Sequence, residues 1–394
     1  MYDLIVIGGG PGGACVSSYV ARAGHKVLLI EKEEFPRFRI GESLLPYSME
    51  IFQELGFYKD LSSGKYIQKN GASFYDTELD EGVYFDFSNN GKAKFPHAYE
   101  VLRSEFDKDF LDFAKNSGVE VRQPETFQDC ELHEDFVSVK TNSGQYKSRF
   151  IIDASGQASI VSKKFQTKKI NNIYHNNFAL YAHFEDVDRS HLKSPGDISI
   201  GILKDSAWSW VIPFQGNVSS VGIVAKKDQV RELKKREDFF EECLNENKWF
   251  GALLKNAKRN GEFKVSSNFS HKSETFCAER WASVGDAMSF LDPVFSSGVH
   301  VSLKSAQIIS KNLIHSLNHS DILLNSPDNL FDYQKELTKG IERFHNLLQI
   351  FYGGNFINKV KGLEKKTHAM RGMTSAVAGG MWEEDNPLFR MGVL

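Results

Sequence analysis

The start of the chain alternates short apolar runs with a stretch of helical periodicity. Asp3–Ile7 is an apolar run that predicts a buried strand, and Lys26–Ile30 predicts a second one. Between them, Ala14–Ala23 places apolar side chains at helical spacing, and Gly24 follows as a stop signal. A strand, a helix and a second strand in this order are typical of a βαβ unit, in which the two strands lie parallel.

Further along the chain, aromatic residues alternate with polar residues and turn formers. This alternation extends over residues 66–100 and again over residues 175–225, and it predicts antiparallel strands. Short apolar runs predict further buried strands at Val119–Arg122, Phe150–Ile152 and Trp281–Val284. Helical spacing predicts helices over Ser104–Ser117, residues 228–260, Gly298–His315 and most of the chain that follows.

Strands that alternate with helices near both ends, around antiparallel blocks, predict an α/β fold with a discontinuous Rossmann-like nucleotide-binding domain. An antiparallel-sheet domain is inserted into it, and a helical C-terminal region follows. We expect the nucleotide-binding domain over residues 1–66, 100–165 and 265–320. The sheet domain, which would hold the substrate, is expected over residues 67–99 and 166–264, and the helical region over residues 321–394.

Composition narrows the function classes. The 394 residues are 41% hydrophobic and 25% charged, with a net charge of −3, so no basic field favours nucleic acid or an anionic membrane. No apolar run approaches the ~20 residues that a membrane helix needs. The four cysteines lie far apart and form no CxxC pair, so we expect no metal site. Scattered cysteines without a recognisable export signal predict a cytoplasmic protein.

The first motif lies between the two N-terminal strands. Gly8, Gly10 and Gly13 have the spacing GxGxxG, and Glu31 follows 18 positions after the last glycine, at the end of the next strand. Such glycines let the backbone approach a pyrophosphate at a helix N-terminus, and the acidic residue accepts a hydrogen bond from a ribose hydroxyl. A glycine-rich turn without a ligand is the alternative, and the motif does not distinguish FAD from NAD.

Two later segments bear on the choice of cofactor. Asp286 follows a predicted strand and Gly285, where its carboxylate could accept from a flavin ribitol hydroxyl; a solvent-facing turn residue is the alternative. Arg103 opens a helix after Glu100-Val101-Leu102. Together with the glycine motif, these residues resemble the FAD-binding fold of the aromatic-hydroxylase superfamily. That resemblance implies FAD rather than NAD.

A serine-rich turn precedes the helix at residue 298. Ser296-Ser297-Gly298 exposes several backbone N–H groups at a helix N-terminus, an arrangement that suits a halide or the anionic edge of a reduced flavin. The alternative is an ordinary N-cap by Ser296 or Ser297.

Two of the five tryptophans are two positions apart. On a strand, Trp208, Trp210 and Ile212 point to one face, and Pro213 ends the pairing. Two indoles on one face can form a flat partition, although ordinary core packing is the alternative.

Three patches resemble the flavin-dependent halogenases, over about residues 1–315. Phe290, Pro293, Ser296 and Gly298 match a spaced Phe-Pro-Ser-Gly pattern of that family. Trp208-Ser-Trp210-Val-Ile212-Pro213 matches its Trp-x-Trp-x-Ile-Pro pattern, and Gly41-Glu42-Ser43-Leu-Leu-Pro46 resembles its segment near the flavin. The tryptophan pattern is the most specific of the three.

The resemblance implies a reaction and a set of site residues. Reduced FAD and oxygen convert chloride or bromide to hypohalous acid, and Lys69 relays the halogen to an arene; Ser297 and Gly298 offer donors to the halide. A lysine suits the relay because its ammonium donates to hypohalous acid, and its amine can be halogenated when buried and neutral. Trp208, Trp210, Ile212 and Pro213 would form the wall of a tunnel between flavin and substrate. The cofactor-binding residues would be Gly8, Gly10, Gly13, Glu31, Lys32, Arg39, Ser43, Arg103, Asp286, Pro293 and Gly298.

Some of these residues have ordinary alternatives. Lys69-Asn70-Gly71 could instead be an exposed hairpin turn, and Arg39 could form a surface salt bridge. His300 could touch flavin or halide or make a polar contact near the helix start. The segment Trp382–Phe389 could cap the substrate pocket.

One departure from the family narrows the expected substrate. Tryptophan halogenases carry a glutamate before the Ser-x-Gly turn, where this chain has Phe295. The chain therefore resembles halogenases of phenols, pyrroles and carrier-protein-bound substrates. No second nucleotide motif is present, so a separate NAD(P)H-dependent reductase would supply reduced FAD. An aromatic hydroxylase, an isoprenoid- or alkene-reducing flavoprotein and a non-enzymatic flavin-binding scaffold are the competing hypotheses.

Overall fold

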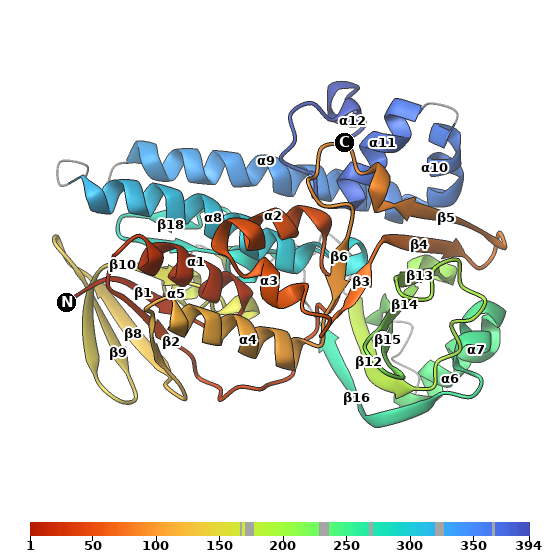
Figure 1. Ribbon diagram of the computed structural model, residues 1–394, viewed down its shortest axis with the longest axis horizontal. Coiled ribbons are helices and arrows are strands. Elements are labelled where there is room, and N and C mark those ends of the chain that lie inside the picture. Colours follow the sequence, from red (N-terminus) through yellow and green to blue (C-terminus); the bar gives the residue numbers. More distant parts are fainter. Residues whose placement is uncertain (166–167, 170–176, 228–235, 268–270, 320–326, 365–366) are drawn as a thin grey trace.

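The computed structural model describes residues 1–394 except 166–167, 170–176, 228–235, 268–270, 320–326 and 365–366. Two large sheets lie at opposite ends of the molecule, and long helices run along one side of both (Figure 1). The predicted α/β fold with a nucleotide-binding sheet, a second sheet and a helical C-terminal region is confirmed.

The nucleotide-binding sheet has the strand order β18-β19-β10-β1-β2-β7. The pairs from β19 to β7 are parallel, whereas β8 and β9 form an antiparallel ribbon on the first half of β10. The strands of this sheet are β1 (Tyr2–Ile7), β2 (Val27–Ile30), β7 (Glu120–Arg122), β8 (Phe127–Leu132), β9 (Val137–Thr141), β10 (Gln145–Asp153), β18 (Cys277–Ala278) and β19 (Trp281–Ser283).

The register of this sheet determines where a ligand can bind. Ile7 pairs with Asp153, and Asp153 pairs with Ser283, so β1, β10 and β19 end at the same edge. The loops after these strands are more than a hundred residues apart in sequence and meet there. The carboxyl edge of a parallel sheet is where α/β proteins bind ligands.

Helices cover the faces of this sheet. Helix α1 begins at Pro11 within the glycine motif and packs against α4 and α8. The helices of this part are α1 (Pro11–Arg22), α2 (Pro46–Leu55), α3 (Tyr58–Leu61), α4 (Arg103–Asn116), α5 (Ile160–Lys164) and α8 (Ser297–Asn318).

The second sheet has the order β16-β12-β15-β14-β13-β4-β5. Its pairs are antiparallel except β4 with β13, which pair in parallel and join two separate stretches of the chain. Its strands are β4 (Gly71–Asp76), β5 (Glu81–Asp86), β12 (Asn177–Glu185), β13 (Ile198–Ile202), β14 (Trp208–Pro213), β15 (Val218–Lys226) and β16 (Lys258–Ser267).

The helix predicted over residues 228–260 is wrong in part. Residues 228–235 lie outside the described part of the chain, and α6 (Arg236–Glu246) and α7 (Lys248–Leu254) follow. The chain then becomes strand β16 from Lys258, because β12 offers an edge with which it pairs. Phe240 and Phe250 of the two helices pack on Val221 and Ile223 of the sheet.

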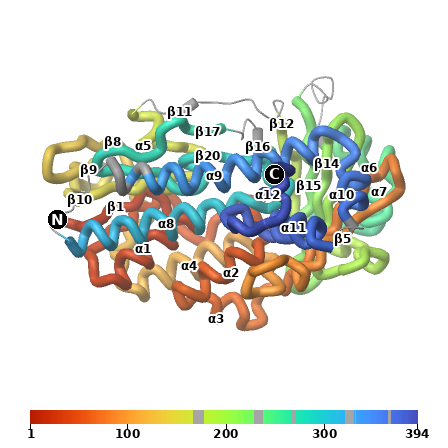
Figure 2. Tube along the Cα trace, turned by 90° about the horizontal axis from the view of Figure 1, so that it is seen from above, coloured from red at the N-terminus to blue at the C-terminus, as the bar shows by residue number. Residues whose placement is uncertain are grey.

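Short strands join the two large sheets. They are β3 (Ile67–Lys69) with β6 (Ala98–Glu100), and β11 (Lys168–Lys169) with β17 (His271–Ser273) and β20 (Ser289–Phe290). The C-terminal helices are α9 (Pro327–Tyr352), α10 (Phe356–Glu364), α11 (Thr367–Val377) and α12 (Pro387–Arg390). Helix α9 runs beside α8, and α10 contacts β4 and β5 at the second sheet (Figure 2).

The domain boundaries at residues 66, 99, 165, 264 and 320 stay a prediction, and those near 165 and 320 border residues outside the described part. Among the described residues, no helix is long and apolar enough to cross a membrane. Within the same residues, no three histidine, cysteine or acidic side chains gather as a metal site would require.

Candidate active site

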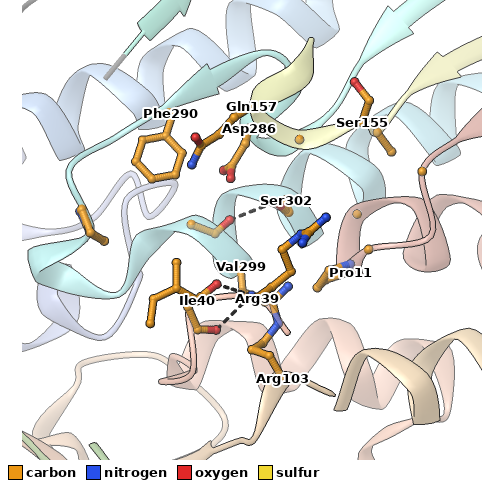
Figure 3. A pocket seen from close by; sticks show the side chains of 18 of the residues that line it. Pro11, Arg39, Ile40, Arg103, Ser155, Gln157, Asp286, Phe290, Val299 and Ser302 are labelled. Atoms are coloured by element: carbon orange, nitrogen blue, oxygen red, sulfur yellow. Dashed lines mark hydrogen bonds between the residues drawn. The ribbon is translucent and has the colours of Figure 1, made fainter. Parts of the chain in front are cut away.

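A cavity of about 530 Å³ opens at the carboxyl edge of the nucleotide-binding sheet. We call it the large cavity. It is lined by Gly8 and Gly10 after β1, Ala154 after β10, Val284 and Asp286 after β19, and Gly298 at the start of α8. Asp286, Gln157 and Phe290 lie on one side of it, and Arg103, Ile40 and Val299 lie on the other (Figure 3).

The glycine turn fits closely under this cavity. Gly8 has a φ of +108°, and a Cβ there would lie 2.4 Å from the Ala154 carbonyl oxygen. A Cβ on Gly13 would lie 1.9 Å from the Gly8 carbonyl oxygen, whereas one on Gly10 would meet only Arg37 at 3.7 Å. No side chain caps the first turn of α1. The helix N-terminus therefore presents its N–H groups to the large cavity, as a pyrophosphate requires. Gly13 itself supports the turn from beneath and is not a lining residue.

Glu31 and Lys32 also line the large cavity. One carboxylate oxygen accepts from the Gly9 backbone N–H at 2.7 Å, and the other accepts from that of Glu33 at 2.8 Å. Glu31 is thus held against the glycine turn while lining the cavity. Glu125, which the sequence reasoning missed, lines the large cavity as well.

Two arginines lie on one side of the large cavity and share an aspartate. Arg103 donates to both oxygens of Asp107 at 2.7 and 2.9 Å and to the Ile40 carbonyl oxygen at 2.7 Å. Arg37 donates to Asp107 at 2.6 Å, and its side chain is 11% exposed. The sequence reasoning missed Arg37 and named Arg39, although both occur in the segment Phe35–Arg39.

Arg39 has two roles in the structure. It lines the large cavity, and its guanidinium donates to both Glu33 oxygens at 2.9 Å with 45% of the side chain exposed. The surface salt bridge considered for Arg39 is therefore present.

Asp286 is partly buried and lines the large cavity across from Arg103 (Figure 3). Burial raises the pKa of its carboxyl group to about 7, and the positive charge of Arg103 opposes that shift. A carboxyl group near half-ionisation can accept or donate a hydrogen bond toward a ligand hydroxyl. Its carboxyl group faces the large cavity rather than the outer surface of the molecule, which disfavours the solvent-facing turn that was the alternative.

The serine-rich turn adopts a left-handed conformation. Ser296 has a φ of +55° and makes no side-chain cap, so α8 begins without the ordinary N-cap. Ser296, Gly298 and Pro293 line the large cavity, whereas Ser297 is buried beside it and does not.

The two tryptophans lie on β14, as predicted. Their ring centres are 5.7 Å apart, and Trp208, Trp210 and Ile212 line the large cavity, whereas Pro213 only ends the strand. The Trp208 indole N–H donates to the Tyr352 hydroxyl at 3.1 Å. That hydroxyl donates to Asp292 at 2.7 Å, which ties the indole wall to the serine-rich turn through α9.

Lys69 is the last residue of β3 and is only 1% exposed. The exposed hairpin turn considered for Lys69-Asn70-Gly71 is wrong, because β3 pairs with β6 while β4 pairs with β5 and β13. The Lys69 ammonium donates to the Ser43 hydroxyl at 2.7 Å and to the Leu44 carbonyl oxygen at 3.0 Å. Burial lowers the pKa of Lys69, and the charges of Glu100 and Asp197 oppose the shift.

A second cavity of only about 10 Å³ lies against Lys69. We call it the lysine cavity. Its lining is otherwise almost wholly apolar and consists of Leu45, Lys69, Ala72, Phe74, Phe87, Ile198, Ile200, Val294, Phe295, Ser296 and Val377. Ile198, Ile200 and Ser296 also line the large cavity, so these three residues lie between the two spaces. The tryptophans line the large cavity alone, and the sequence reasoning missed Ile198 and Ile200.

His300 and Trp382 lie away from both cavities. The His300 ring shares a hydrogen bond with the Ser48 hydroxyl at 2.9 Å, and burial lowers the pKa of His300 to about 3. Trp382 packs near His300 and donates to the Glu336 carbonyl oxygen. The C-terminal region reaches the lysine cavity through Val377 at the end of α11 instead.

The fold and the large cavity define a class of protein. A Rossmann-like sheet, a glycine turn that leaves no room for a Cβ, an uncapped helix N-terminus and an adjacent arginine pair fit a pyrophosphate cofactor such as FAD. By these criteria the protein is a dinucleotide-binding protein of the Rossmann-like α/β class.

Comparison with known proteins gives the family. A family profile described as tryptophan halogenase matches residues 3–94 and 86–359. The 1H-pyrrole-2-carbonyl-(peptidyl-carrier protein) brominase of Pseudoalteromonas luteoviolacea is 31% identical over 77% of this chain and 75% of its own length. The corresponding chlorinase of Pseudomonas fluorescens is 28% identical over 90% of this chain and 84% of its own length.

Solved structures agree on the fold. A flavoprotein/dehydrogenase from Cytophaga hutchinsonii superposes with a TM-score of 0.90 at 27% identity, covering 100% of this chain and 96% of that one. The flavin-dependent brominase Bmp2 has a TM-score of 0.89 at 24% identity, covering 100% and 98%, and shows the fold alone. The chain belongs to the tryptophan halogenase family. It is a flavin-dependent halogenase, an oxidoreductase that uses FAD and halide.

Proposed function

We propose that this enzyme transfers chlorine or bromine to an electron-rich phenol or pyrrole, either free or tethered to an acyl or peptidyl carrier protein. The choice of pyrrole and of a carrier protein is supported by the activities of the chlorinase and the brominase to which the chain is similar. A separate NAD(P)H-dependent reductase would supply the reduced FAD.

The large cavity would hold FAD. The pyrophosphate would lie over the N-terminus of α1 beside Arg37 and Arg103, with Glu31 and Lys32 toward one end and Asp286 toward the other. Bound reduced FAD, with oxygen and a halide, supplies hypohalous acid. The backbone N–H groups of Ser297 and Gly298 would hold the halide at the start of α8.

The observation that carries the proposal is the position of Lys69. It is a buried lysine with a lowered pKa, and three side chains separate its cavity from the large one. A wall of Ile198, Ile200 and Ser296 favours passage of a molecule as small as hypohalous acid over passage of an arene. The arene is thereby kept from direct oxygen transfer, which favours halogenation over hydroxylation.

At Lys69, the halogen would pass from hypohalous acid to the arene. The ring electron pair forms the new carbon–halogen bond, and the bond between halogen and its donor atom breaks. The proton that leaves the ring carbon balances the reaction, so that arene and hypohalous acid give haloarene and water. Phe74, Phe87 and Phe295 offer apolar faces for the ring.

The residue at position 295 supports the proposed substrate class. Phe295 packs against Phe74, Phe351 and Phe356, and it provides no carboxylate at the serine-rich turn. A phenol or pyrrole has enough electron density to react without one, which is why we propose these rings rather than indole.

Lys69→Met tests the proposal. With reduced FAD, oxygen and bromide or chloride, the wild-type enzyme should halogenate members of a phenol panel or carrier-bound pyrrole-2-carboxylate. We expect Lys69→Met to lower that rate by about 10²–10⁴-fold, since a positioned acid–base group contributes about this much. Oxidation of the flavin and release of hypohalous acid to a diffusing scavenger should continue.

Lys65→Met is the matched control, because Lys65 is exposed and pairs with Asp109 on α4. A Lys69→Met enzyme with wild-type halogenation would overturn the relay. Oxygenated arene formed without halide would identify a hydroxylase instead, and anaerobic alkene reduction would identify a reductase.

A further inference from the structure

Glu100 is a buried carboxyl group without an evident structural purpose. It is the last residue of β6 and is 1% exposed. Among the described residues, neither of its carboxylate oxygens makes a hydrogen bond of ordinary geometry, although the Ser43 hydroxyl and the Ile198 backbone lie close enough to lower the pKa of the carboxyl group. Burying a carboxyl group costs free energy unless the group is hydrogen-bonded or paired with an opposite charge. The groups around Glu100 therefore decide its protonation state.

The pairing of β3 with β6 places Glu100 close to Lys69. Ile67 pairs with Glu100 and Lys69 pairs with Ala98, so the Lys69 and Glu100 side chains leave the same face as diagonal neighbours. Ser43 forms an isolated bridge with Glu100, and its hydroxyl accepts from the Lys69 ammonium at 2.7 Å. Ser43 thus contacts both residues.

A third charged group acts on Lys69 and Glu100. Asp197, just before β13, acts on both residues, but its two oxygens already accept from the Asn70 backbone N–H and the Tyr84 hydroxyl, each at 2.7 Å. Burial raises the pKa of Glu100 to about 7, and the charge of Lys69 opposes that shift. Burial moves the two pKa values toward each other, which favours a shared proton.

We propose that Glu100 acts through Lys69 as its proton acceptor, taking a proton from the ammonium so that a neutral amine meets the hypohalous acid. This inference rests on the Lys69 relay proposed above. The lysine gives one proton to the carboxylate, and the amine pair then forms the nitrogen–halogen bond. The halogen–oxygen bond breaks with its pair going to oxygen, which takes a proton from nitrogen and leaves as water.

Transfer to the arene restores the amine. The ring pair forms the carbon–halogen bond, the nitrogen–halogen pair returns to nitrogen, and the proton lost by the ring carbon replaces the missing N–H. Glu100 keeps its proton during these steps, so the next hypohalous acid again meets a neutral amine. One carboxyl group therefore serves repeated turnovers.

The first test measures Lys69 itself in the full-length protein without added flavin. Lysine labelled with ¹³C at Cε gives one signal that Lys69→Met removes, and its shift is followed with pH. We expect the wild-type signal to show a step near pH 7 that reports Glu100. In Glu100→Gln this step should vanish and Lys69 should lose its proton at lower pH, because no carboxylate favours the ammonium. An unchanged titration in Glu100→Gln would overturn the inference.

The second test is the pH profile of halogenation. Between pH 6 and 8 the wild-type rate should rise as Glu100 loses its proton, whereas in Glu100→Gln this rise should be absent and the rate should follow the titration of Lys69 itself, as measured in the first test. Glu100→Asp should recover the rise, and the exposed Glu105→Gln should match the wild type. If Glu100→Gln does not fold, absence of the step near pH 7 in Glu100→Asp contradicts the inference.

The two proposals fail differently. If Lys69→Met is inactive while Glu100→Gln keeps the wild-type profile, the proton acceptor is wrong and the relay stands. If Lys69→Met remains active, the relay itself is wrong.

Discussion

The large cavity measures about 530 Å³ and the lysine cavity about 10 Å³, although Ile198, Ile200 and Ser296 line both. The large cavity is lined by backbone, arginines and carboxyl groups from loops at one sheet edge, and by apolar side chains of the second sheet such as Trp208 and Trp210. The lysine cavity is lined by apolar side chains around a single ammonium group. The first is preformed for an extended polar ligand. The second holds about one water-sized sphere. An arene can therefore enter the lysine cavity only if the side chains that line it move.

The difference shows that two parts of one chain shape neighbouring cavities in different ways. Backbone geometry shapes the large cavity, since a glycine turn and three strand ends determine its form. Side-chain packing shapes the lysine cavity, since Phe74, Phe295 and Val377 come from a sheet, a turn and a C-terminal helix. The two should therefore respond to different mutations.

The largest effect is expected at the lysine cavity. Phe295→Ala should lower the free energy of unfolding by about 3–5 kcal/mol, because a 3%-exposed ring packed against three other rings is removed. Phe290→Ala, at a half-buried ring of the large cavity, should cost less than half as much. Urea unfolding of both variants measures the difference. Equal losses would mean that the two cavities are packed alike.

A smaller effect is expected at the glycine turn. Gly13→Ala should lower the free energy of unfolding by about 2–3 kcal/mol, because its Cβ would lie 1.9 Å from a backbone oxygen. Gly10→Ala has room and should stay within about 0.5 kcal/mol of the wild type. Its Cβ lies toward the pyrophosphate, so FAD affinity should fall about tenfold, or about 1.4 kcal/mol. Unfolding curves and FAD titrations check both variants, and a stable Gly13→Ala would contradict the packing argument.

The smallest effect concerns Asp286 and pH. Its pKa is about 7 in the folded protein and near 3.8 when unfolded, so the folded state binds the extra proton between these values. Stability therefore falls as pH rises from about 4 to 7, and the loss persists above pH 7. Without flavin, Asp286→Asn should be more stable than the wild type at pH 8 by on the order of 2 kcal/mol, and equal to it near pH 4. A difference independent of pH would show that another property of the side chain is responsible.

Much of the fold follows from local patterns. The βαβ start, the strand with both tryptophans and the helix after Gly298 are all observed, because periods of two and 3.6 residues and glycine turns are properties of short segments. The helix predicted up to residue 260 fails where β16 begins, since pairing with β12 outweighs local preference.

The site could be anticipated only in part. Motifs with recognisable spacing mark four of the site residues in the sequence, namely Gly8, Asp286, Trp208 and Lys69. Arg37 stands two positions before a named arginine, and Glu100 and Ile198 lie in ordinary strand-like sequence without a motif. Which of these side chains face a common space depends on strand register, which no single segment specifies.

The sequence by itself determined the nucleotide-binding class, the family resemblance and a lysine worth testing, because each depends on residues close together in the chain. Only the tertiary structure decided that Ile198, Ile200 and Ser296 lie between the two cavities, with the tryptophans facing one of them. It also decided that Glu100 lies beside Lys69, because the register of β3 on β6 brings them to one face. Burial by distant segments then sets the pKa values of both groups, and that burial exists only in the folded chain.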